Sequence, residues 1–312
     1  MLADKSGLHD AVLNNDPEAV NKLLGEETDV NSLDKGGRTA LHLAASYNSI
    51  IIEKLLSVTG VDTNISDGVL KWTPLRYAAK TRSWMAVDSL LQGGADDIVL
   101  KVFYQDQEWR RAALWECAQK GHRNLLEFIM NSGFDVNDVV SHPEYNHRKL
   151  PLLHIASLYS QEEVVRLLIE RGVDINVRSF DNETALHFAA QRGNVEIMTL
   201  LVDAGMSVNE TSTGDETPLH VAARHGNLRA TEFLVERGAD LEIADTIGRT
   251  PLMLAVSRGN VEVVRYLTMK GADVNSCTDD VIALLLATDG AHLDVMDFLR
   301  LQGADFNGSN VE

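Results

Sequence analysis

The feature that most constrains this chain is a segment that recurs about every 33 residues. One copy, residues 216–240, reads ETPLHVAARHGNLRATEFLVERGAD. Thr217 is a favourable helix N-cap, and Pro218 suits the first helical position, where its missing N–H is not needed. Gly226 can end that helix in the left-handed conformation, and a second, amphipathic helix is predicted over residues 228–237. A helix pair this short cannot bury its apolar face alone, so neighbouring copies must stack against it.

Nine copies of this repeat can be aligned along the 312 residues. The residues at the position of Thr217 are, in order, Ser6, Thr39, Thr73, Ala112, Pro151, Thr184, Thr217, Thr250 and Ile282. Successive positions differ by 32 to 39 residues, and self-similarity at such a period is typical of a solenoid. We therefore predict that residues 1–312 form a single array of helix pairs.

The repeated segments also carry a specific combination of residues. The first helices include TALHLAA, TALHFAA, TPLHVAA and TPLMLAV, and the turns that close the repeats include QGGAD, ERGVD, ERGAD and LQGAD. From about Ser6 to Asn307, this combination strongly resembles the ankyrin repeat family. The resemblance implies an all-α ankyrin-repeat solenoid in which each repeat has a β-turn finger and two antiparallel helices. The first helices would line the concave face of a right-handed superhelix, and the second helices its convex face.

The third and fourth repeats depart from the pattern. Longer connections follow them, and we place enlarged β-turn fingers near residues 96–109 and 135–150. Arg82 stands where the seventh repeat has Gly226, and Ala112 stands where a capping threonine is expected. Loss of such a cap costs on the order of 1 kcal/mol. We therefore expect the middle of the array to be its least stable part, with the fastest amide exchange.

The charge and composition of the chain limit its partners and its location. The formal net charge is −18, which disfavours nucleic acid and anionic membrane surfaces as partners. No apolar run approaches membrane-spanning length, and the N-terminal sequence lacks an apolar signal-peptide core. Cys117 and Cys277 are far apart in sequence and are expected to be free thiols. We expect a monomeric cytoplasmic protein, with the nucleus as an alternative location.

We identify no catalytic or metal-binding motif in the sequence. Five histidines, three residues after the capping position, could in principle bind a metal, but the resemblance implies that they bond backbone groups of neighbouring turns. They are His9, His42, His154, His187 and His220. His142, Glu144 and His147 form a weak metal-like group in the second long connection, but Pro143 breaks any helical spacing and favours a solvated loop. We therefore expect no cofactor, no metal and no enzymatic activity.

Four turn asparagines are candidates for modification. Asn31, Asn176, Asn275 and Asn307 each follow an acidic and an apolar residue, with a leucine eight positions earlier. This pattern resembles the ankyrin sites of asparaginyl hydroxylases. The alternative, which we favour, is that asparagine simply tolerates the turn conformation.

The resemblance implies that a partner binds on the fingers and the concave ends of the first helices. The candidate residues are Arg38, Tyr47, Trp72, Trp109, Arg110, Tyr159, Phe180, Glu183, Arg192, Arg224, His225, Arg249 and Arg258. Aromatic residues dominate the first half of this set, and four arginines form a basic stripe in the second half. One hypothesis is therefore a peptide partner with an apolar- or aromatic-seeking end and an acidic end. The alternative is that the tryptophans pack beneath the long connections and the arginines pair with finger carboxylates.

These features favour a protein–protein interaction module or scaffold over an enzyme. Two alternatives stay open at this point. One is a substrate-recruiting adaptor of a ubiquitin ligase. The other is the binding portion of a larger ankyrin-containing enzyme, channel or toxin.

Overall fold

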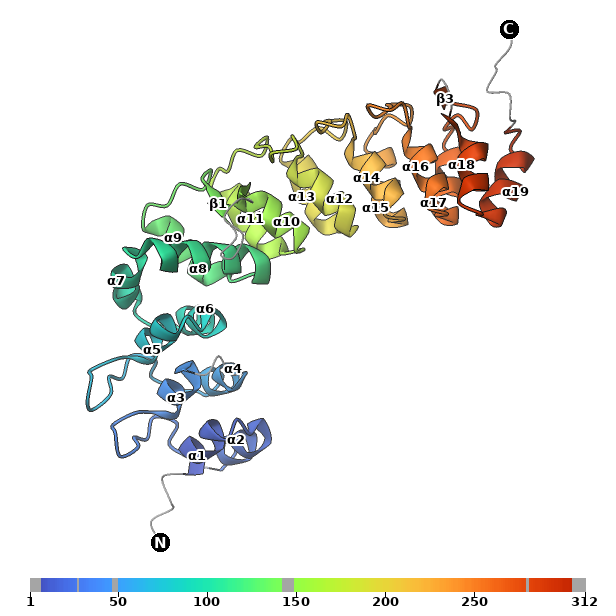
Figure 1. Ribbon diagram of the computed structural model, residues 1–312. Coiled ribbons are helices and arrows are strands. Elements are labelled where there is room, and N and C mark those ends of the chain that lie inside the picture. The colour runs from blue at the N-terminus through green and yellow to red at the C-terminus, as the bar shows by residue number, and fades with distance from the viewer. Residues whose placement is uncertain (1–6, 27, 47–49, 142–148, 279–280, 305–312) are drawn as a thin grey trace. The chain divides into compact units, whose positions relative to one another are not determined.

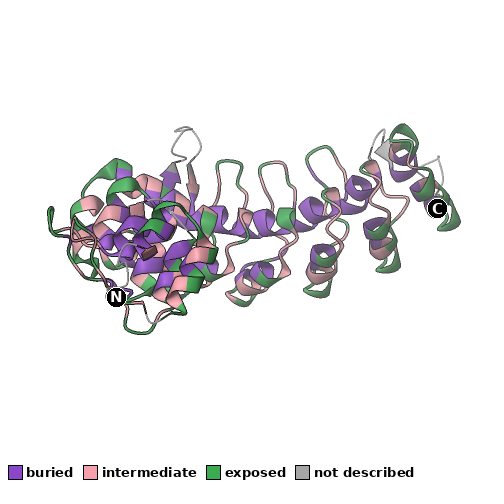
Figure 2. Cartoon of the chain, turned by 90° about the horizontal axis from the view of Figure 1, so that it is seen from below, coloured by how far each residue is buried: buried purple, intermediate pink, exposed green. Residues whose placement is uncertain are grey.

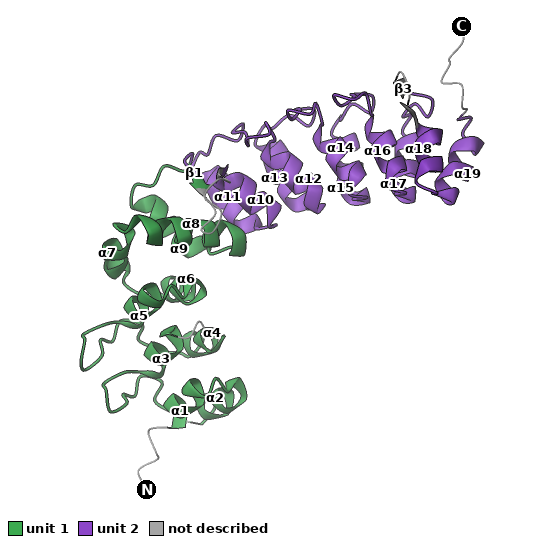
Figure 3. Cartoon of the chain, viewed as in Figure 1, with its two compact units in different colours: residues 1–136, 140–147 green, residues 137–139, 148–312 purple. Residues whose placement is uncertain are grey.

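The computed structural model describes residues 7–26, 28–46, 50–141, 149–278 and 281–304, and it is built mainly from short helices (Figure 1). It confirms the predicted all-α solenoid. The chain divides into two compact units (Figure 3). The N-terminal unit comprises residues 1–136 and 140–147, and the C-terminal unit comprises residues 137–139 and 148–312. The repeat pattern predicts one array, and the division into two units falls at the second long connection.

The N-terminal unit begins with three regular helix pairs. Its helices are α1 (Gly7–Leu13), α2 (Pro17–Leu24), α3 (Ala40–Ser46), α4 (Ile51–Leu56), α5 (Pro74–Thr81), α6 (Trp84–Gln92), η1 (Asp97–Val99), α7 (Leu100–Tyr104), α8 (Gln107–Lys120) and α9 (Arg123–Asn131). The first helices α1, α3 and α5 pack side by side, as do the second helices α2, α4 and α6. Ala44, Ala45, Ala78 and Ala79 are fully buried on the first helices, and these small side chains allow the helices to approach closely.

The segment 96–109 is helical, so the prediction of an enlarged β-turn finger there was wrong. The side chain of Asp96 caps η1, and that of Asp106 accepts hydrogen bonds from the backbone N–H groups of Glu108 and Trp109 at 2.9 and 3.2 Å. The cap at Asp106 starts α8 at Gln107, well before Ala112. The helix is therefore capped although Ala112 replaces the expected threonine. The residue at this position gives no reason to expect that the fourth repeat is weak.

The second long connection is described only at its ends. The strands β1 (Val139–Ser141) and β2 (Lys149–Pro151) lie on either side of residues 142–148. His142, Glu144 and His147, which form the metal-like group, lie outside the described residues.

The C-terminal unit is a regular series of helix pairs. Its helices are α10 (Leu152–Leu158), α11 (Glu162–Glu170), α12 (Ala185–Arg192), α13 (Val195–Asp203), α14 (Pro218–Arg224), α15 (Leu228–Glu236), α16 (Pro251–Ser257), α17 (Val261–Met269), α18 (Ala283–Asp289) and α19 (Leu293–Leu301). The short strands β3 (Cys277–Thr278) and β4 (Val281–Ile282) pair antiparallel. Figure 2 shows the first helices of this unit as a mostly buried row, with partly or fully exposed fingers beside them.

The repeated histidines bond the neighbouring repeat, as the resemblance implied. In His187 and His220, Nδ1 accepts a hydrogen bond from the backbone N–H of the capping threonine at 3.0–3.1 Å. Nε2 then carries the proton and donates to the carbonyl oxygens of Glu216 and Arg249 in the next repeat, at 2.9 and 3.0 Å. Burial lowers the pKa of His187 to about 4, so the ring is neutral at pH 7. The described histidines of this series therefore belong to the scaffold.

The turn asparagines also connect repeats. The Asn31 side chain donates to the carbonyl of Gly60 at 2.8 Å and accepts from the N–H of Asp62 at 2.9 Å. Asn209 makes the same two contacts with Gly238 and Asp240, at 3.4 and 2.9 Å. These bonds give a structural reason for asparagine at this position, beyond tolerance of the turn conformation.

Candidate protein-binding surface

The candidate residues of the N-terminal unit are engaged in internal contacts wherever they are described. Arg38 forms an ion pair with Asp34 at 2.8 Å. The ring of half-buried Trp72 lies 5.0 Å from the guanidinium of Arg76. Tyr47 lies outside the described residues.

Trp109 is not on the binding surface, and its assignment there was wrong. It is 2% exposed, and its Nε1–H donates to the carbonyl of Ala79 at 3.0 Å. Its ring packs edge-on against Trp84, with centroids 5.1 Å apart. The reason is that α8 begins at Gln107, which turns Trp109 into a core residue of a helix instead of a finger residue. Trp109 is thus buried, as in the alternative, but within a helix and not beneath a β-turn finger.

Arg110, next to it on α8, is also held within the unit. Its Nη1 donates to the carbonyl of Tyr104 at 2.8 Å, and its guanidinium lies 5.0 Å from the centre of the Tyr104 ring. Most of the described side chains in the aromatic half of the candidate surface thus make contacts within the N-terminal unit.

The fingers of the C-terminal unit do present apolar side chains. Phe180, in the finger of residues 179–183, is 97% exposed. Ile247, in the finger of residues 245–249, is 63% exposed and was missed by the sequence analysis, although an isoleucine between Thr246 and Gly248 in a turn was a usable signal. Glu183 is half-buried, and burial raises the pKa of its carboxyl group.

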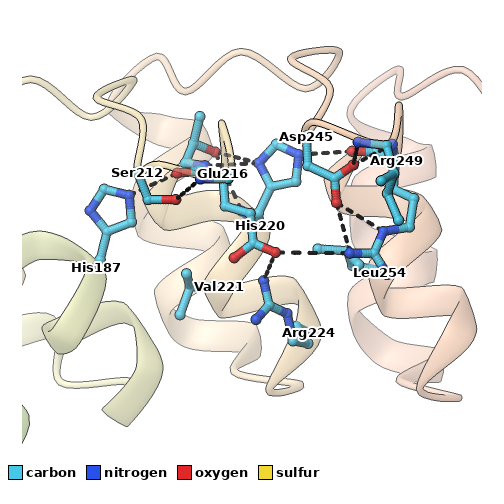
Figure 4. Close-up of polar contacts among 12 residues, drawn as sticks. His187, Ser212, Glu216, His220, Val221, Arg224, Asp245, Arg249 and Leu254 are labelled. Atoms are coloured by element: carbon cyan, nitrogen blue, oxygen red, sulfur yellow. Dashed lines mark hydrogen bonds and ion pairs between the residues drawn. The ribbon is translucent and has the colours of Figure 1, made fainter. Parts of the chain in front are cut away.

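The basic stripe is partly neutralised by its own fingers (Figure 4). Arg224 forms an ion pair with Glu216. Arg249 pairs with Asp245 at 2.8 Å and lies 4.0 Å from Glu216. Two of the four arginines therefore form ion pairs with finger carboxylates, as the alternative hypothesis predicts.

The other two arginines are exposed at equivalent places. Arg192 ends α12 and Arg258 follows α16, each eight residues after its capping threonine. Neither forms an ion pair within the described part of the chain. His225 occupies the same position after α14, and Tyr159, which is half-buried, occupies it after α10. Because α10, α12, α14 and α16 pack in sequence, these four residues form a line that we call the end row.

His225 can offer one ring nitrogen to a partner at this position. Its Nδ1 donates to the carbonyl of Val221 at 2.9 Å, and its side chain is exposed. With Nδ1 occupied in this way, Nε2 remains for a partner. The end row thus offers two guanidinium groups, an imidazole and a tyrosine.

The described residues contain no group of three or more His, Cys, Asp or Glu side chains that could hold a metal. Cys117 is fully buried on α8, and burial raises the pKa of its thiol. No helix in the described part of the chain is both long and apolar enough to span a membrane.

Comparisons with known proteins agree with the repeat pattern. The family model for ankyrin repeats (3 copies) matches residues 8–102, 86–179, 153–245 and 242–310. The chain is 29% identical over 152 residues to the nuclear factor NF-kappa-B p105 subunit of Rattus norvegicus, covering 46% of this chain and 14% of that protein. It is 28% identical over 183 residues to the B-cell lymphoma 3 protein homolog of Mus musculus, covering 57% and 38%.

Enzymes are also among the similar proteins. An L-asparaginase of Dirofilaria immitis is 30% identical over 166 residues, which cover 53% of this chain and 26% of that enzyme. The chain thus spans less than half the length of each of these three relatives. The ankyrin repeat, whose family model matches along the chain, is a protein–protein interaction module. On the evidence of the family model and the stacked helix pairs, the chain belongs to the ankyrin repeat family.

Proposed function

We propose that this chain is a protein-binding scaffold that holds a segment of a partner protein along the end row and the fingers of the C-terminal unit. The observation that supports this most is the pair Arg192 and Arg258, two exposed guanidinium groups at equivalent positions two repeats apart. A protein that needed these arginines for its own stability would be expected to pair them, as it pairs Arg224 and Arg249.

The partner segment that fits is acidic at two separated points. Guanidinium groups bind carboxylates through paired, charge-assisted hydrogen bonds. Between Arg192 and Arg258, the ion pairs of Arg224 and Arg249 leave little free positive charge. The continuous basic stripe expected from the sequence therefore becomes a two-point contact, with His225 between the points.

An apolar residue of the partner has a place on the same unit. Phe180 and Ile247 are exposed at finger tips, and large apolar side chains are frequent anchors at protein interfaces. We therefore place the apolar contact of the partner at the fingers of the C-terminal unit instead of at Trp72 or Trp109.

Affinity capture with the intact chain tests this proposal. The double variant Arg192→Ala with Arg258→Ala is compared with Arg171→Ala with Arg229→Ala, which removes two exposed arginines outside the end row. Hydrogen bonds to charged groups contribute about 1.5–3 kcal/mol each, so the first variant should weaken the captured partner at least tenfold. The second should leave its affinity within about threefold. Equal capture by all three proteins would exclude the end row as the binding surface.

A further inference from the structure

The N-terminal unit contains a cavity that the proposed function does not use. Its volume is about 490 Å³, and it opens between α4, α6 and the C-terminal end of α8. Its chemically distinctive lining residues are Glu53, Trp84, Asp88, Glu116, Lys120 and His122. They come from consecutive repeats of the N-terminal unit, so the cavity is formed by the packing of that unit alone.

The charges around this cavity do not balance. Three carboxylates face one ammonium group. Glu53 and Glu116 form no hydrogen bond or ion pair through their side chains within the described residues. Lys120 does not pair with Glu116, although the two are four residues apart on α8, where such pairs commonly form. The free carboxylates therefore give the cavity a negative field.

The remaining polar groups of the lining do not cancel the negative charge of the cavity. Asp88 is fixed by the backbone N–H of Leu125 at 2.9 Å and by the side-chain amide of Asn124 at 3.2 Å. These bonds are to neutral donors, so no cation is paired with this carboxylate by them. Burial lowers the pKa of His122 despite the opposing effects of Asp88 and Glu116, so this ring is neutral at pH 7 and does not add a cation.

One wall of the cavity is aromatic. Trp84 is 9% exposed, and its ring is held edge-on by Trp109 at 5.1 Å between centroids. A tryptophan that lines a cavity next to uncompensated carboxylates is suited to an organic cation, because aromatic rings attract positive charge. A planar guanidinium can stack on such a ring and donate to carboxylates at its edge, which a compact ammonium cannot do as well.

We propose that this cavity is a second binding site, which takes an arginine side chain of a partner peptide. Its charge preference is opposite to that of the end row, and the site does not depend on the proposed function of the C-terminal unit. A divalent metal is a poorer occupant, because the described residues contain no suitable ligand set.

The probe is the acetylated and amidated tripeptide Gly-Arg-Gly, compared with Gly-citrulline-Gly, which has nearly the same shape without the charge. Binding to the intact chain is followed by the tryptophan indole N–H signals in ¹⁵N NMR, and Trp84→Phe assigns the signal of Trp84. We expect the arginine peptide to shift that signal in a saturable manner and the citrulline peptide to leave it unchanged. Ethylguanidine, a guanidinium compound with a single positive charge and no peptide backbone, tests whether a small cation occupies the site instead.

Two variants separate binding at the site from general charge effects. Glu53→Gln with Glu116→Gln removes the two free carboxylates, and Glu53 is exposed, so its change should not disturb folding. This variant should weaken peptide binding at least fivefold. Glu108→Gln, also on α8 but outside the cavity, should leave binding unchanged.

Four results would overturn the proposal. They are the absence of any shift of the Trp84 signal at millimolar peptide, an equal response to the citrulline peptide, an equal loss of binding in Glu108→Gln, and ethylguanidine binding that is tighter than peptide binding. If the double variant has a lower melting temperature, Glu53→Gln alone replaces it, and a loss of binding of about twofold or more is then expected.

Discussion

The C-terminal unit and the later repeats of the N-terminal unit build the same kind of helix stack with different interactions. In the C-terminal unit, capping threonines and buried histidines repeat from one helix pair to the next, as at Thr184–His187 and Thr217–His220. In the N-terminal unit, the later repeats are joined by aromatic contacts, including Trp84 with Trp109 and Tyr104 with Phe128.

This difference shows which parts of the repeat can be replaced. The polar network requires a threonine, a histidine and a carbonyl at fixed spacing, so it is visible in the sequence. The aromatic contacts need only large side chains of suitable shape, and they tolerate the shifted start of α8. A repeat that loses the polar network can therefore stay in the stack if enough apolar surface is buried.

The tryptophans provide a means to test this comparison. All four, Trp72, Trp84, Trp109 and Trp115, lie in the N-terminal unit. Intrinsic tryptophan fluorescence therefore reports the unfolding of that unit, whereas circular dichroism reports both units. The two signals need not follow one two-state transition.

Acidification should have the largest effect, and mainly on the C-terminal unit. Burial lowers the pKa of His154 and His187 to about 4, below the ordinary value of 6.5. The unfolded chain binds more protons between these values, so the stabilisation is complete above pH 6.5 and is lost as the pH falls towards 4. Each shift corresponds to about 3 kcal/mol. Burial also lowers the pKa of His220 in this unit and of His42 and His122 in the N-terminal unit, so both units lose stability on acidification, and the C-terminal unit contains the two largest shifts.

Urea unfolding at pH 7 and pH 4.5 should therefore show a larger fall in the midpoint by circular dichroism than by fluorescence. The carboxyl groups of Asp34 and Asp67, whose pKa values are lowered, add their effect mostly at still lower pH. Equal falls in both signals would show that the buried histidines do not distinguish the units.

Trp109→Ala should have the next largest effect, on the N-terminal unit. The substitution removes a buried ring and its hydrogen bond to Ala79, and large-to-small changes of this kind cost about 3–5 kcal/mol. Trp72→Ala is the matched control, because Trp72 is only half-buried and should cost much less. Fluorescence of the remaining tryptophans during urea unfolding gives both values, and similar costs would contradict the assignment of Trp109 to the core.

Asn260→Ala should destabilise the C-terminal unit by about 1–2 kcal/mol. The Asn260 amide donates to the carbonyls of Ala223 and Arg224 in the preceding repeat, at 2.8 and 3.1 Å. The midpoint by circular dichroism should fall, and the fluorescence midpoint should not change. Glu262→Ala, an exposed change two residues away, is the control and should stay within about 0.5 kcal/mol of the parent.

Pro151→Thr should have the smallest effect, a gain of about 0.5–1 kcal/mol. Pro151 occupies the threonine position, and Nδ1 of the buried His154 has no hydrogen-bond partner. Threonine would supply both the N–H and the hydroxyl found at His187. Pro151→Ala supplies only the N–H and should recover less, as measured by thermal unfolding. A loss of stability in Pro151→Thr would mean that the rigidity of proline matters more at this site.

The sequence was sufficient where the structure depends on local chemistry. Thr217, Pro218 and His220 each have a preferred position in a helix start, so the regular helices and the histidine bonds followed from the pattern. The start of α8 did not follow, because the repeat pattern puts the capping position at Ala112, whereas the side chain of Asp106 caps the helix and Trp109 is buried. Whether an arginine is paired also depends on a carboxylate in another finger, which repeat spacing does not reveal.

The histidine bonds all point the same way along the chain. Nε2 of His42, His154, His187 and His220 reaches a carbonyl about 29 or 30 residues later, in the following repeat. A repeat that opens therefore removes a hydrogen-bond acceptor from the repeat before it, whereas the repeat after it keeps its own histidine bond. The histidine bonds by themselves would therefore let local opening spread more readily towards the N-terminus. The amides of Asn227 and Asn260 donate to the preceding repeat and act in the opposite direction, so the two sets of bonds together couple each repeat to both of its neighbours.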